Sequence, residues 1–177
     1  VVTSPLERCR QTSKAITDQQ ADRPRVVSDK SITECDYGDW QGRKLADLAK
    51  EDLWSIVQGH PSAAAFPGGE SMAAMQARAV AAIRGHDAAF EDGAGAVWAA
   101  VTHGDIIKAI LADALGMHLD LFQRINVDPA SVSIIRYTSA RPYVVATNTH
   151  AGDLSWLRAK PADDDAPVGG GAGRSAG

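Results

Sequence analysis

The spacing of apolar and polar positions along the chain changes several times between a strand-like period of two and a helical period. Val1 to Thr3 has the β-branched character of a strand end, and Ser4 and Pro5 then suit the cap and first turn of a helix. We expect this helix to end near Gln20 and to bury Leu6, Cys9, Ser13 and Ile16. A short strand is predicted at Arg25 to Ser28.

Two longer helical patterns occupy the middle of the chain. Lys44 to Gln58 predicts one helix, whose core-facing positions are Leu45, Leu48, Leu53 and Ile56. The prolines and adjacent glycines between His60 and Glu70 predict a loop. Ser71 can cap the second helix. Its apolar stripe consists of Met72, Met75, Ala79, Ala82 or Ile83, His86 and Phe90. On that stripe His86 is interpreted as a core or boundary histidine.

The second half of the chain continues the alternation. Ala96 to Thr102 is a continuous apolar run before a helix, which is typical of a parallel strand covered on both faces. The following helix carries apolar residues from Ile106 to Leu115 and is predicted to end at Gly116. After a helical turn at 119–124, strands at 131–137 and 143–148 predict an antiparallel hairpin at the sheet edge. This order indicates a three-layer α/β fold in which helices cover both faces of a mostly parallel sheet.

Composition and charge narrow the class of protein. The chain has 177 residues, of which 45% are hydrophobic, and this is enough for one domain, predicted at 1–158. The segment 159–177 is rich in Pro and Gly and is expected to be a disordered tail. A net charge of −4 without a basic run argues against nucleic acid as a partner. The chain contains neither an apolar run of about 18 residues nor an export signal. We therefore expect no membrane partner and a cytoplasmic location, where Cys9 and Cys35 remain thiols.

Candidate chemistry lies at two strand-to-helix junctions. His103 follows the apolar strand directly, and Gly104 after it allows close approach of a ligand to the backbone. Ser4 and Arg8 occupy the equivalent place after the first strand. Strand ends and helix N-termini in an open α/β sheet favour anions, and a guanidinium can hold a phosphoryl group. Taken alone, His103 is equally well explained as a helix-capping residue. Arg8 taken alone is equally well explained as a solvated surface residue. Together they predict one anion site.

The loop ITECDYGDWQG, Ile32 to Gly42, adds a carboxylate to this site. Glu34 stands at its start, where it could face the same pocket. A carboxyl group kept protonated there could donate a proton to a departing alkoxide. Asp36 and Asp39 compete for that role, with Asp39 the more typical of a solvated loop position.

Four motifs taken together resemble the histidine phosphatase superfamily, which has the phosphoglycerate mutase-like fold. They are SPLERCRQT, ECDYGDWQG, PGGES and VTHGDIIKAIL, and they span about Val2 to Tyr137. The resemblance implies a small phosphorylated substrate, no metal or other cofactor, and a phosphohistidine intermediate. It gives Arg8 and His103 to the phosphate pocket, where His103 is the second histidine. It assigns proton donation to Glu34 and associates Glu70 and Ser71 with the pocket.

One signature of that family is missing. The attacking histidine belongs to an RHG motif on the first strand, and no RHG occurs in this sequence. We therefore expect the chain to be truncated, lacking the first strand and helix, and to be inactive without them. That strand would lie centrally in the sheet, so its loss is expected to leave unpaired edges on two neighbouring strands.

Three alternatives to a phosphomonoester hydrolase stay open. A phosphoglycerate mutase-type phosphotransferase is one, although the loop from Gly59 to Gly69 is short for closing a pocket against water. A phosphate-binding or partner-binding module is the second, if Val1 is the true start. A metal site formed by His118 and Asp120 or His60 is the third, but these residues lack a ligand-pair spacing. The sequence leaves the oligomeric state and the particular substrate open.

Overall fold

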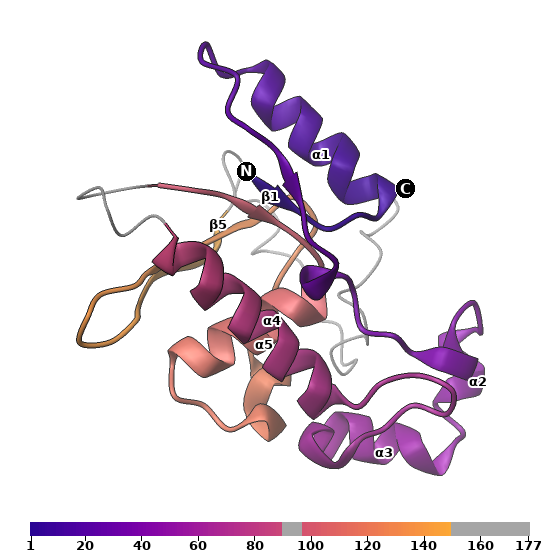
Figure 1. Cartoon of the computed structure of the whole chain (residues 1–177). Coiled ribbons are helices and arrows are strands. Elements are labelled where there is room, and N and C mark those ends of the chain that lie inside the picture. The colour runs from indigo at the N-terminus through magenta and orange to yellow at the C-terminus, as the bar shows by residue number, and fades with distance from the viewer. Residues whose placement is uncertain (90–96, 150–177) are drawn as a thin grey trace, which may run out of the picture.

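The computed structural model of the chain describes residues 1–89 and 97–149, and its helices and strands alternate along the sequence (Figure 1). In chain order the strands are β1 (Val2–Thr3), β2 (Val27–Ser28), β3 (Ala100–Val101), β4 (Val132–Arg136) and β5 (Tyr143–Thr149). The α-helices are α1 (Glu7–Asp18), α2 (Leu45–Leu48), α3 (Asp52–Gly59), α4 (Met72–Ala88) and α5 (Gly104–Ala114). Short 3₁₀ helices are η1 (Lys30–Ile32), η2 (Gly38–Trp40), η3 (Pro61–Ala63) and η4 (Leu119–Arg124). Phe90 and the predicted tail 159–177 lie outside the described residues.

The strands form two sheets rather than one. The first is parallel with the order β2-β1-β3, in which Val2 pairs with Val27 on one side and with Ala100 on the other. The second is the predicted antiparallel hairpin of β4 and β5. Within the described residues no ladder joins β3 to β4, so the hairpin is not hydrogen-bonded to the parallel sheet there. The mixed α/β class is confirmed.

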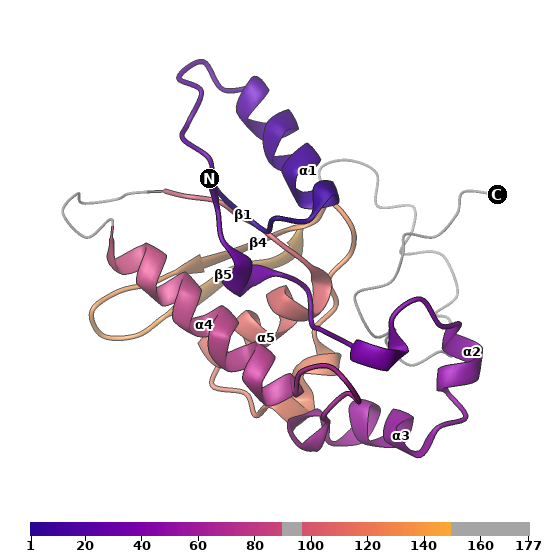
Figure 2. The ribbon, with the colours of Figure 1, turned by 45° about the vertical axis from the view of Figure 1, so that its right-hand side comes forward.

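Helices lie on both sides of the parallel strands. Figures 1 and 2 show α1 on one side and α4 with α5 on the other, which is the predicted layering. Gly116 has a φ of +66° just beyond α5, a conformation that glycine adopts without strain, and it ends the helix as expected. Within the described residues, no helix is both long enough and apolar enough to cross a bilayer.

Several boundaries differ from the sequence prediction for physical reasons. The helix expected from Lys44 to Gln58 is divided into α2 and α3, and the break changes the rotational phase of the apolar positions. Leu48 is therefore buried, whereas Leu45 is 48% exposed. The strand expected from Ala96 to Thr102 is regular only over β3. It is not covered on both faces, because Ala100 is exposed. No described strand pairs with its second edge. In α1, Thr17 is buried in place of Ile16.

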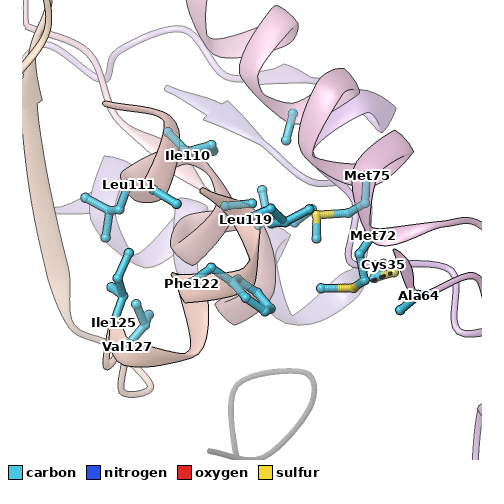
Figure 3. Close-up of a cluster of buried hydrophobic side chains, with 14 of the residues drawn as sticks. Cys35, Ala64, Met72, Met75, Ile110, Leu111, Leu119, Phe122, Ile125 and Val127 are labelled. Carbon is cyan, nitrogen blue, oxygen red and sulfur yellow. Dashed lines mark hydrogen bonds between the residues drawn. The ribbon is translucent and has the colours of Figure 1, made fainter. Parts of the chain in front are cut away.

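The core lies between α4, α5, η4 and buried side chains of the segments that precede α4 (Figure 3). The predicted stripe of α4 supplies Met72, Met75, Ala79 and Ile83, all of which are buried. Phe122 of η4 is completely buried against this cluster. Ser71 caps α4 as expected, since its hydroxyl accepts a hydrogen bond from the Ala74 amide at 3.1 Å.

Two glycine-containing loops cross each other next to this core. A Cβ atom on Gly38 would lie 2.1 Å from the Pro67 carbonyl oxygen, and one on Gly69 would lie 2.2 Å from that of Asp36. The amide of Asp39 donates to the Pro67 carbonyl at 2.8 Å. Only glycine allows this approach, so the ECDYGDWQG and PGGES motifs form one backbone-to-backbone unit.

Candidate functional site

A serine and a histidine stand at the ends of two neighbouring parallel strands. Ser4 follows β1, and His103 follows β3 and caps α5. Because β1 and β3 are parallel and paired, their carboxyl ends lie side by side. The two junctions identified in the sequence therefore meet at one edge of the sheet. Gly104 is the first residue of α5, where the amides of the first turn lack helical partners.

Arg8 joins this pair from the first turns of α1. Its Nη2 donates to His103 Nδ1 at 2.8 Å, and His103 Nε2 lies 2.7 Å from the Ser4 hydroxyl oxygen. Since a guanidinium only donates, Nδ1 must be the unprotonated nitrogen, and the ring proton sits on Nε2 and points to Ser4. Cys9, the residue after Arg8, places its sulfur 3.5 Å from Nε2.

His103 is held in its neutral form. The residue is 5% exposed. Burial, followed by the positive charges of Arg8 and Arg78, lowers the pKa of His103 to about 4 from its ordinary value of 6.5. At neutral pH the imidazole therefore contributes hydrogen bonds rather than a charge. Arg8 supplies the positive charge at this end of the site.

Glu34 lines the same cavity as Arg8. Arg8 and Glu34 both line a hollow of about 660 Å³. Burial, and next the negative charge of Asp105, raise the pKa of Glu34 to about 8 from 4.5. Its Oε1 also accepts a hydrogen bond from the Cys35 amide at 3.0 Å. Glu34 is therefore a carboxyl group that retains its proton at neutral pH, as general-acid chemistry requires.

Asp105 is the buried anion beneath Glu34. It is fully buried on α5, and the Tyr37 hydroxyl donates to its Oδ2 at 2.8 Å. Lys108 places Nζ 4.0 Å from Oδ1 and is itself buried. The sequence analysis missed both residues. Their signal was an acid and a base three positions apart on the apolar face of α5, a pattern that a solvated helix surface does not explain.

A second guanidinium fixes the backbone around Glu34. Arg78 of α4 donates from Nη1 to the Ser31 and Thr33 carbonyl oxygens, both at 2.8 Å, and from Nη2 to that of Glu34 at 3.2 Å. Arg78 also forms a bidentate ion pair with Glu70. The sequence analysis missed Arg78, although its place three residues after Met75, beside the apolar stripe, could have indicated a partly buried role.

Glu70 and Ser71 have partners within the fold. Besides its pair with Arg78, Glu70 accepts a hydrogen bond from the Asp36 amide at 3.0 Å through Oε1, and the Ser71 hydroxyl is the cap of α4. The structure thus gives both side chains a role in joining the two crossing loops to α4. Their contact with substrate stays a prediction.

The competing carboxylates are placed differently from Glu34. Asp36 and Asp39 are both exposed. Oδ1 of Asp36 accepts hydrogen bonds from the Gly38 amide at 3.1 Å and from Gln41 Nε2 at 2.7 Å. Of the three acids, Glu34 is the one whose burial favours the protonated form.

The other described histidines lie outside the cavity. His86 Nε2 is 2.8 Å from Asp29 Oδ2, in keeping with a boundary role. His118 and His60 both face Asp120, with Nδ1 3.2 Å and 3.8 Å from its Oδ2. The three residues of the metal alternative are therefore neighbours. Over residues 1–89 and 97–149, however, no three ligand-type side chains are arranged to hold a metal ion.

Comparison with known proteins connects this geometry to a family. The family model for the histidine phosphatase superfamily (branch 1) matches residues 1–150. A bifunctional protein of Mycobacterium tuberculosis is 32% identical over 142 residues, which are 77% of this chain and 36% of that protein. The chain thus spans about a third of the length of this relative. A probable phosphoglycerate mutase of Yersinia enterocolitica is 30% identical over 89% of this chain and 72% of its own length.

Solved structures agree on the fold. A mycobacterial glucosyl-3-phosphoglycerate phosphatase in complex with inorganic phosphate has a TM-score of 0.73 at 22% identity, covering 84% of this chain and 76% of that one. A putative alpha-ribazole-5'-P phosphatase from Escherichia coli has a TM-score of 0.70 at 21% identity, with coverages of 86% and 74%. At these identities the likeness shows the shared fold.

Proposed function

The chain belongs to the histidine phosphatase superfamily, and from this membership we propose that the intact protein is a phosphomonoester hydrolase that works through a phosphohistidine. The observation that carries the proposal is the pairing of a cation with a protonated acid across one cavity. Arg8 supplies the cation, and the raised pKa of Glu34 supplies the acid. Phosphoryl transfer requires both, since charge must be stabilised on the phosphoryl oxygens and the leaving alkoxide must be protonated.

The reaction has two steps. An imidazole nitrogen attacks phosphorus, the bond from phosphorus to the ester oxygen breaks, and Glu34 gives its proton to the departing oxygen. Water then attacks the phosphohistidine, loses a proton to Glu34 and releases inorganic phosphate. Arg8 and the first amides of α5 bind the phosphoryl oxygens in both steps, and His103 positions Arg8 through the hydrogen bond to its guanidinium.

We place the attacking imidazole on a segment that precedes Val1 in the natural protein. Among the described histidines, His103 is the one that contacts Arg8, which lines the cavity, and Arg8 and Ser4 already occupy its two nitrogens. Within the described residues, β3 is paired only with β1, and β4 only with β5. An added strand that paired in parallel with the second edge of β3 would end beside His103, where the nucleophile is needed.

Hydrolysis is favoured over transfer to a second substrate. A mutase must protect the phosphohistidine from water, whereas the described loop between α3 and α4 is a short segment packed onto the fold through η3 and the Ala65–Ser71 bridge. The relative named as a probable phosphoglycerate mutase keeps phosphotransfer as the second candidate. Both activities share the phosphohistidine.

The decisive experiment uses the natural protein, including the sequence before Val1. It should release phosphate from a panel of phosphomonoesters and form an acid-labile phosphoprotein. His103→Ala should lower turnover by a factor of about 10² to 10³, because Arg8, a donor to the developing oxyanion, then loses the imidazole that positions it. His86→Gln is the matched control, because that histidine pairs with Asp29 away from the cavity. Unchanged turnover in His103→Ala would reject the site, and phosphate binding without any turnover would identify a binding module.

A further inference from the structure

The cavity extends well beyond the phosphate end. Its volume of about 660 Å³ exceeds what one phosphoryl group needs and falls in the range of sites for small organic ligands. Away from Arg8, the wall consists largely of apolar and aromatic side chains from α1, the crossing loop and α2. They are Leu6, Tyr37, Trp40, Leu45 and Leu48.

The charged side chain that Arg43 adds to this wall already has a partner. Arg43 lines the cavity but forms an ion pair with Glu51. Glu51 is held in place from its other oxygen, which accepts a hydrogen bond from Trp40 Nε1 at 3.0 Å. Arg8, by contrast, has no carboxylate partner among the described residues. The cavity therefore offers one available cation, next to Glu34.

A second anionic group on the substrate would meet an unfavourable environment. Arg43, the other cation among the described lining residues, is already paired with Glu51, and moving a carboxylate from water to the apolar part of the wall is costly. The Asp36 side chain also lines the cavity and offers only acceptor oxygens to a second anionic group. An apolar leaving group, in contrast, gains from contact with Leu45 and its neighbours.

We infer that this cavity selects phosphomonoesters whose only anionic group is the phosphate and whose leaving group is apolar, and that it discriminates against phosphorylated acids. The inference rests on the proposed function, because it takes the Arg8 end as the phosphate site. It assigns specificity to the α2 side of the cavity, with Leu45 as the accessible determinant.

Unreactive phosphonates measure this preference without any turnover. Methylphosphonate, phenylphosphonate and 3-phosphonopropanoate share the phosphonate head, and the last adds a carboxylate. Their dissociation constants can be read from the Trp40 indole signal in NMR titrations of the natural protein. We expect phenylphosphonate to bind about 10-fold more tightly than methylphosphonate, by burial of its ring. 3-Phosphonopropanoate should bind no better than methylphosphonate. If it bound the most tightly of the three phosphonates, the inference would be overturned.

A charge introduced on α2 should reverse the preference. Leu45→Lys is expected to improve the affinity for 3-phosphonopropanoate several-fold, by about the strength of an exposed ion pair, and to weaken phenylphosphonate binding. Leu115→Lys is the matched control, because Leu115 is 50% exposed, Leu45 is 48% exposed, and the same charge is added at the far end of α5. Both positions are half exposed, so both variants should fold. Equal responses in the two variants would contradict the assignment to α2.

The same titrations separate failure of this inference from failure of the proposed function. Inorganic phosphate should bind, and Arg8→Met should abolish its binding. If phosphate does not bind, or binds equally well to Arg8→Met, the phosphate site itself is wrong. If phosphate binds through Arg8 but the three phosphonates rank otherwise, only the specificity is wrong.

Discussion

The strand-end cluster beside the cavity and the carboxyl group that lines it keep their titratable groups neutral through opposite pKa shifts. At the strand ends, burial and positive neighbours lower the pKa of His103 to about 4, so the imidazole carries no charge. At the crossing loops, burial and the negative charge of Asp105 raise the pKa of Glu34 to about 8, so the carboxyl keeps its proton. Burial disfavours the charged form of both groups. Positive neighbours lower the pKa of the imidazole further, and a negative neighbour raises that of the carboxyl group further. The comparison teaches that one cavity can provide an anion site and an acid at the same pH.

The largest expected effect is on turnover, and it should depend on the leaving group of the substrate for Glu34 but not for Arg8. In the natural protein, Glu34→Gln should reduce turnover of an alkyl phosphate by a factor of about 10² to 10⁴, because the alkoxide then leaves unprotonated. Turnover of p-nitrophenyl phosphate, whose leaving group needs no proton, should change little. Arg8→Met should reduce turnover of both substrates. Steady-state kinetics on the two esters measures this, and equal losses in Glu34→Gln would remove its role as proton donor.

The pH dependence of stability should show the two opposite shifts. Between pH 4 and 6.5, the unfolded chain protonates His103 while the folded protein does not, so this residue makes stability rise with pH. Between pH 4.5 and 8, the folded protein keeps the Glu34 proton that the unfolded chain has lost, so this residue makes stability fall with pH. The two effects oppose each other below pH 6.5, and above it only the decline from Glu34 remains.

Urea unfolding at pH 6.5 and pH 8 tests these signs. At about 1.4 kcal/mol for each pH unit, Glu34 should lower the free energy of unfolding by at most about 2 kcal/mol over this interval. Glu34→Gln should abolish its share of that decline, whereas Asp39→Asn, at an exposed position of the same loop, should leave it unchanged. An identical decline in Glu34→Gln and the parent protein would mean that Glu34 is ionised throughout.

An effect of similar size on stability distinguishes the two guanidiniums. Arg78→Lys should lower the free energy of unfolding by about 1–3 kcal/mol, since lysine cannot reproduce the hydrogen bonds to Glu70 and to three carbonyl groups. Its phosphate affinity should be unchanged. Arg8→Lys should do the reverse, because Arg8 is exposed and faces the cavity. Unfolding curves and phosphate titrations on both variants provide the measurement, and a loss of phosphate affinity in Arg78→Lys would contradict the division.

The sequence alone determined the local structure and the two junctions. The caps and stops at Ser71 and Gly116 depend on neighbouring backbone groups, so their residues could be read directly. The same holds for the stripe of α4, which is buried as predicted. Ser4, Arg8 and His103 could be brought together in advance because parallel strands end at one edge of a sheet.

Tertiary structure alone decided the protonation states and the support of Glu34. The pKa of Glu34 depends on Asp105, which is 71 positions away in sequence, and on how deeply both are buried. Arg78 reaches its partners only because α4 packs against η1 and the crossing loops. The break between α2 and α3 likewise follows from packing, not from periodicity. Electrostatic shifts and long-range hydrogen bonds depend on distances in space, and those distances are set by packing between segments that the sequence places far apart.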